Sequence, residues 1–65
     1  MLGKDHVDVA RSYNNMANVY EAQGKYGEAL KLYEQSLAIN IKVFGNDHPK
    51  VAELQRVIES LRAKL

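Results

Sequence analysis

The chain contains no cysteine, so no disulfide bond can hold it together and its fold must depend on packing. A lack of cysteine fits a reducing compartment, and we expect a cytoplasmic protein. The sequence also lacks any apolar run near the roughly 20 residues of a membrane-spanning helix. Residues 1–5 lack the apolar core of a signal peptide. We therefore expect no membrane partner.

The sequence has no strong excess of charge of one sign. Its 9 basic and 8 acidic residues are interleaved, for a net charge of +1. No basic block indicates nucleic acid as a partner. With 65 residues the chain can form one small domain at most. A chain this short buries only about 60% of the surface exposed on unfolding, so association with further units would add stability.

An internal repeat is the strongest positive signal. Residues 2–10 read LGKDHVDVA and residues 44–52 read FGNDHPKVA, an offset of 42 residues. A repeat of this length is typical of stacked helical arrays, in which one unit cannot bury its apolar face alone. We expect one full unit and the start of a second, as in a fragment of a longer array.

Hydrophobic periodicity predicts an all-α fold of three helices. The first runs from about 7 to 23, with Asp5 as its N-cap, and Gly24 ends it. The second runs from about 26 to 43 and is apolar on two adjoining faces, which indicates a helix packed between two partners. Short connections make neighbouring helices antiparallel.

The third helix is predicted from Pro49 to Lys64, because proline suits the first turn of a helix. Its apolar seam comprises Val51, Leu54, Ile58, Leu61 and Leu65. Its other face is polar, as a C-terminal capping helix requires, through Gln55, Glu59 and Arg62. We therefore divide the chain into a helix-turn-helix unit, 1–45, and a C-terminal capping helix, 46–65, together a fragment of an α-solenoid.

The first two helices resemble the tetratricopeptide repeat pattern W-x2-L-G-x2-Y…A-x3-F…P. The matching positions are Tyr13, Met16, Ala17, Tyr20, Ala29 and Tyr33. Ala17 and Ala29 are small where two helices must approach closely. The final proline is replaced by Ile41, and the repeat is 42 residues long. Together with the DH-x-x-VA and AQGKY strings, this resembles the repeats of kinesin light chains.

The resemblance implies a protein-interaction scaffold that binds extended peptides or adaptor and cargo proteins, without catalysis or a cofactor. In such arrays the first helices line a groove, and the corresponding polar stripe here comprises Arg11, Asn14, Asn15, Asn18 and Glu21. Asparagine amides can both donate to and accept from a peptide backbone. The alternative is a structural unit, excised or designed, that mainly folds and self-associates. We expect the surface around Ser12, Asn15, Met16 and Val19 to lack its neighbour, which allows a homo-oligomer, with or without helix exchange.

The remaining motifs predict no metal binding, phosphate binding or catalysis. The pairs Asp5-His6 and Asp47-His48 recur at helix starts, where capping and contacts between repeats explain them, and neither has a third metal ligand nearby. The Gly24–Gly27 stretch lacks the spacing of a phosphate-binding loop, and we expect a turn between helices. No histidine is arranged to activate a serine, so the sequence predicts no catalytic residue.

Overall fold

In the computed structural model, which describes residues 7–65, the chain folds into three α-helices with no strand in that range. They are α1 (Val7–Ala22), α2 (Tyr26–Phe44) and α3 (Pro49–Lys64). The predicted ends of α1 and α2 are each off by one residue, and α3 is confirmed. The proposed cap Asp5 lies outside the described residues.

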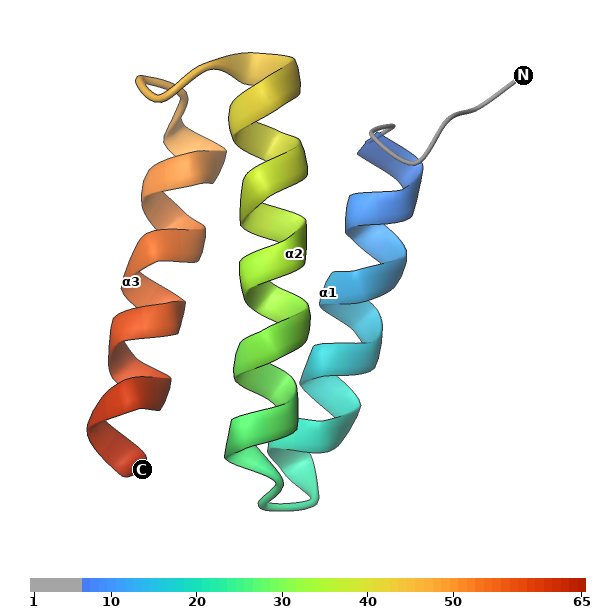
Figure 1. Cartoon of the computed structure of the whole chain (residues 1–65), viewed down its shortest axis with the longest axis vertical. Helices are drawn as coiled ribbons and strands as arrows, with labels where there is room; N and C mark the ends of the chain where they lie inside the picture. The colour runs from blue at the N-terminus through green and yellow to red at the C-terminus, as the bar shows by residue number, and fades with distance from the viewer. Residues whose placement is uncertain (1–6) are drawn as a thin grey trace.

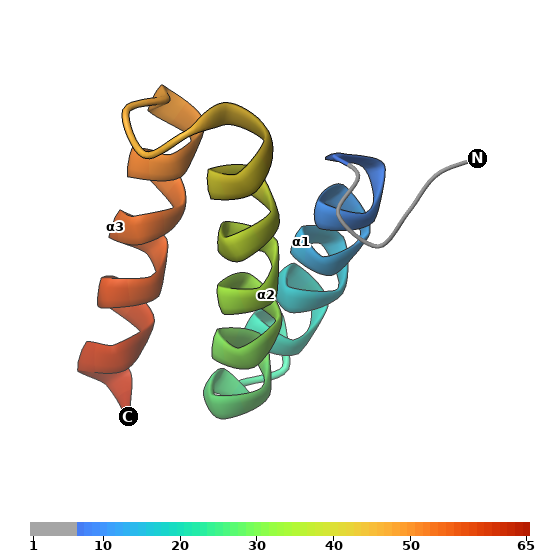
Figure 2. The same ribbon diagram turned by 45° about the horizontal axis from the view of Figure 1, so that its top comes forward.

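The three helices lie side by side, with α2 between the other two in both views of the molecule (Figures 1 and 2). Helix α2 packs against α1 and against α3, whereas the backbones of α1 and α3 do not contact each other within residues 7–65. This confirms that α2 is sandwiched between two partners. Because α2 runs antiparallel to both neighbours, α1 and α3 point the same way and begin at the same end of the molecule (Figure 1).

Glycine sets both turns. Gly24 has φ +81° after α1, and Gly45 has φ +88° after α2, a region that other residues rarely adopt. The Gly45 N–H closes α2 by donating to the Ile41 carbonyl at 2.8 Å. His48 caps the start of α3, because its Nδ1 accepts from the Lys50 N–H at 3.1 Å. The expected capping role of the second Asp-His pair is therefore confirmed, through the histidine.

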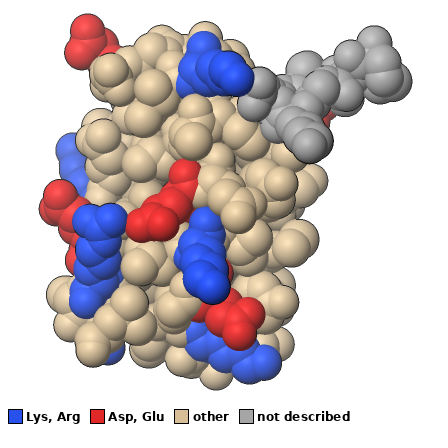
Figure 3. All heavy atoms as spheres, in the orientation of Figure 1, with Lys and Arg blue, Asp and Glu red and all other residues tan. Residues whose placement is uncertain are grey.

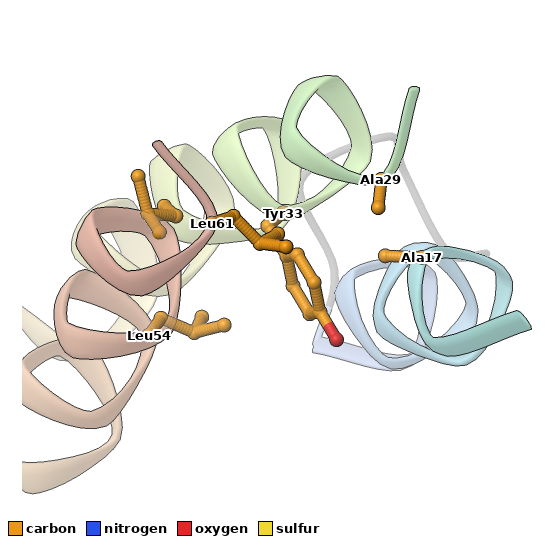
Figure 4. Close-up of a cluster of buried hydrophobic side chains, with 6 residues drawn as sticks. Ala17, Ala29, Tyr33, Leu54 and Leu61 are labelled. Carbon is orange, nitrogen blue, oxygen red and sulfur yellow. The ribbon is translucent and has the colours of Figure 1, made fainter. Parts of the chain in front are cut away.

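The contact between α1 and α2 depends on two small residues. Ala17 and Ala29 face each other across this contact and are fully buried (Figure 4). Tyr20 and Tyr26 pack beside the same cluster, which α3 completes with Leu54, Ile58 and Leu61. The small residues thus let two helices approach while larger side chains fill the space beside them.

Two buried polar residues of α2, Ser36 and Asn40, also favour one register of α2 against α1. The Ser36 hydroxyl is fully buried and donates to the Ala10 carbonyl of α1 at 3.0 Å. The Asn40 Nδ2 donates to the Ser36 carbonyl at 3.0 Å. Because a buried hydroxyl without a partner is costly, this bond favours one register of the two helices.

The predicted seam of α3 is right at four positions and wrong at the fifth. Val51, Leu54, Ile58 and Leu61 are buried, but Leu65 is 69% exposed because the helix ends one residue earlier. The polar face of α3 is solvent-exposed, as predicted, at Gln55, Glu59 and Arg62. None of the helices in residues 7–65 is both long enough and apolar enough to cross a bilayer.

Candidate functional site: a groove between the first and third helices

A groove of about 320 Å³ opens between α1 and α3, with α2 as its floor. Helix α1 and helix α3 each form one wall. The lining residues are Val7, Arg11, Asn14 and Asn18 from α1, Tyr33 and Asn40 from α2, and Lys50, Glu53, Leu54 and Val57 from α3. In Figure 4, Tyr33 projects from α2 toward the space between the other two helices, with its hydroxyl farthest from α2. The groove exists because the outer helices are held apart by the one between them.

Three of the five residues in the predicted polar stripe line this groove. Arg11, Asn14 and Asn18 are spaced i, i+3 and i+7, so they share one side of α1. Asn15 follows Asn14, so it lies 100° around the helix from it, and its side chain is exposed outside the groove. Glu21 lies about one helical turn after Asn18, the last α1 residue that lines the groove. It accepts a hydrogen bond from Tyr33 and does not line the groove itself.

The floor of the groove carries a buried phenol with two acceptors. Tyr33 is 4% exposed, and its single hydroxyl proton is shared between two acceptors, Asn18 Oδ1 and Glu21 Oε1, the latter at 3.1 Å. Burial, together with the hydrogen bond to the Glu21 carboxylate and the repulsion of its charge, raises the pKa of Tyr33 to about 12. The tyrosine therefore stays neutral and orients the Asn18 amide at the edge of the groove.

One polar atom in the groove wall has no partner. The Asn14 Oδ1 atom is buried and accepts no hydrogen bond from any residue in 7–65. A buried acceptor in this state carries a desolvation cost of about 1–3 kcal/mol. If the amide turned toward the groove, a donor from a molecule lying there, such as a peptide N–H, would remove this cost.

Sequence reasoning missed the wall contributed by α3. The 42-residue offset places Arg56, Val57 and Ser60 opposite Asn14, Asn15 and Asn18, but of these only Val57 lines the groove. The same 42-residue offset places Glu53 opposite Arg11, and this signal could have identified the second wall.

The groove combines both charges with amides and apolar surface. Arg11 and Lys50 contribute positive charge, one from each wall, and Glu53 contributes one negative charge. Such a mixture suits a peptide, whose backbone needs donors and acceptors and whose side chains differ in charge. On the face shown in Figure 3, basic and acidic side chains of the described residues are interspersed rather than gathered by sign.

The described residues hold no arrangement that suggests a metal centre. Within residues 7–65, no group of three or more His, Cys, Asp or Glu side chains lies close enough together to hold an ion. His48 instead caps α3 and stacks on the Phe44 ring, with centroids 4.3 Å apart. The pair Asp5-His6 lies outside the described residues.

Comparison with known proteins identifies the repeat. Residues 9–50 match the tetratricopeptide repeat family, and the chain belongs to that family. It is 38% identical over 52 residues to the clustered mitochondria protein homolog of Aedes aegypti, covering 80% of this chain and 4% of that protein. It is 33% identical over 54 residues to the tetratricopeptide repeat protein 23-like of Mus musculus, covering 83% of this chain and 12% of that protein. The chain thus spans a small part of these relatives, and no solved structure matches it.

Proposed function

We propose that this chain is a non-catalytic protein-interaction scaffold whose groove binds an extended peptide segment of a partner protein. Membership of the tetratricopeptide repeat family supports a scaffold role in general. The observation that carries the proposal is the unpartnered Asn14 Oδ1, which lies in a groove walled by two helices. A peptide N–H is one donor that would satisfy this acceptor once the Asn14 amide turns toward the groove.

The resemblance to kinesin light chains supports a finer proposal. This resemblance rests on the 42-residue period and the DH-x-x-VA strings, and it implies that a parent protein built from such repeats links adaptor or cargo proteins to a motor in the cytoplasm. Purification of the parent protein from a cytosolic fraction, followed by identification of bound proteins, tests this finer proposal. Recovery of the protein from a membrane or secreted fraction would contradict it.

The size of the groove sets the expected affinity. A volume of about 320 Å³ lies at the small end of ligand sites, and one repeat offers little surface compared with a stable protein interface. We therefore expect weak binding by the isolated chain, with a Kd on the order of 1 mM, and tighter binding by an array. NMR titration detects binding in this range.

The test compares two asparagines on the same helix. A peptide library is screened against the chain by NMR, and the best peptide is titrated into N14A and N15A variants. Losing one hydrogen bond weakens binding by about 2- to 10-fold, so we expect this effect for N14A and no change for N15A, which lies outside the groove. Helicity should stay the same or rise in both. Equal affinities of the two variants would refute the role of the groove.

A structural role in self-association is the second candidate. It is favoured by Met16 and Val19, two apolar side chains on α1 that are 47% and 56% exposed. Sedimentation equilibrium over a wide concentration range measures it directly. A monomer at every concentration would exclude it for the isolated chain.

A further inference from the structure

The hydroxyl of Tyr33 joins the floor of the groove to the α1 wall. Tyr33 is buried on α2, and its hydroxyl shares one proton between Asn18 Oδ1 and Glu21 Oε1, both on α1. In Figure 4 the ring projects out of α2 and the oxygen lies at its far end. A phenylalanine ring would fill the same space, so the specific effect of the hydroxyl falls on the two α1 side chains.

This hydrogen bond gives the Asn18 amide one orientation. The Oδ1 atom accepts from Tyr33, and within residues 7–65 the Nδ2 group on the other side of the amide has no partner. Asn18 lines the groove, and its side chain is exposed. A side-chain amide has two N–H donors and one carbonyl acceptor. With Oδ1 bound by Tyr33, Asn18 presents its two donors to a molecule in the groove.

Asn14 presents the complementary group on the same wall. Its Oδ1 is buried with no donor among residues 7–65, and it can accept one once the amide turns toward the groove. Asn14 and Asn18 are four residues apart, which is about 6 Å along the helix axis. Two residues of an extended chain cover about the same distance, and their main-chain groups point to the same edge. The α1 wall therefore matches the N–H and C=O groups along one edge of an extended peptide.

The α3 wall differs in kind. Its polar lining residues are the charged Lys50 and Glu53, and the 42-residue offset from Asn18 leads to Ser60, which does not line the groove. Helix α3 therefore offers no side-chain amide to a peptide main chain. Charged side chains suit the charged side chains of a ligand instead. The main-chain contacts thus belong to α1.

We propose that Tyr33 is a positioning residue for peptide recognition, which holds the Asn18 amide so that Nδ2 donates to a main-chain carbonyl of the bound peptide. The inference rests on the proposed function of the groove and adds the class of ligand, an extended segment held by its main chain. The residue whose N–H meets Asn14 cannot be proline, because proline has no N–H. The carbonyl that meets Asn18 belongs to a residue about two positions away.

The first experiment removes the donor and keeps the bond to Tyr33. The best peptide from the library is titrated into N18D and N15D variants of the 65-residue chain, followed by NMR. Aspartate at position 18 still accepts from Tyr33 but cannot donate, so we expect binding to weaken by about 2- to 10-fold. N15D adds the same charge outside the groove and should leave the affinity nearly unchanged.

The second experiment tests the positioning itself. Y33F keeps the ring but frees the Asn18 amide, so it should weaken peptide binding by about 2- to 10-fold, because the amide must then be ordered on binding. In an N18A background, Y33F should have no such effect on affinity. The Asn18 side-chain N–H₂ signals, assigned by their loss in N18D, should shift when the peptide binds to the parent chain and shift less in Y33F.

Two results would overturn the inference while leaving the groove as the peptide site. One is equal affinities of N18D and N15D together with a weakened N14A, because the Asn18 donor would then have no role. The other is a Y33F effect of the same size with and without N18A, since Tyr33 would then act through packing alone. Equal affinities of N14A and N15A would instead refute the groove itself and this inference with it.

Discussion

Raising the pH should destabilise this protein through Tyr33, and the effect can be isolated with one substitution. The pKa of Tyr33 is raised from 10.0 to about 12, first because the phenol is buried and then because Glu21 lies beside it. Between these two pH values the folded chain keeps the phenolic proton and the unfolded chain loses it. Stability from this group is therefore complete below pH 10 and is lost as the pH rises to about 12.

The magnitude follows from the shift. Two units correspond to roughly 3 kcal/mol, which is large for a chain of this size. Near neutral pH, Y33F should lose about 1–2 kcal/mol, because it removes the hydrogen bonds to Asn18 and Glu21. As the pH rises from 10 to 12, the difference between the two chains should shrink and change sign, since phenylalanine has no proton to lose.

Urea unfolding followed by circular dichroism at several pH values between 7 and 12 provides the assay. All other ionisable groups are common to the two chains, so the difference between the two unfolding free energies isolates Tyr33. A difference that stays constant from pH 9 to 12 would refute the reasoning, because it would show a phenol with an ordinary pKa.

Three further predictions concern the packing of the helices. Ala29→Leu should lower the melting temperature by about 5–20 °C because Ala29 is fully buried against α1, whereas Ala38→Leu at an exposed position of α2 should change it little; equal shifts would contradict close packing at Ala29. His48→Ala should lower the free energy of unfolding by about 1 kcal/mol, because it removes the N-cap of α3. His48→Asn should restore most of this stability, since asparagine is a good N-cap. A His48→Asn variant as unstable as His48→Ala would argue against capping. Arg62→Ala should change stability by less than about 0.5 kcal/mol, although Arg62 contacts Glu34 at 3.0 Å, because both side chains are exposed; a loss above 1 kcal/mol would show that this exposed pair is strongly coupled.

The helices could be predicted from the sequence because local signals agree with each other. Gly24 and Gly45 mark the turns, Pro49 marks a helix start, and apolar spacing gives each buried face. Leu65 continues that spacing and was wrongly assigned to the core, because periodicity alone does not show where a helix ends.

The groove could be predicted only in part, because it depends on helices that are distant in sequence. Arg11, Asn14 and Asn18 share a helix face, so one wall follows from local geometry. The second wall, with Lys50 and Glu53, depends on α1 and α3 lying parallel on either side of α2.

The packing of Tyr33 could be predicted from the sequence, but its hydrogen bonds could not. Its position in the repeat pattern predicts packing, which the structure confirms. The hydroxyl that reaches Asn18 and Glu21 depends on how α1 and α2 cross, and no local pattern reports that.

Chemical-shift mapping by NMR with the best peptide from the library tests the peptide-binding groove most directly. The account predicts that the largest changes fall on the two groove walls, at Arg11, Asn14 and Asn18 of α1 and at Lys50 and Glu53 of α3. Met16 and Val19, which are exposed on α1 and do not line the groove, should change little. The largest changes at Met16 and Val19, with the groove walls unaffected, would contradict the account.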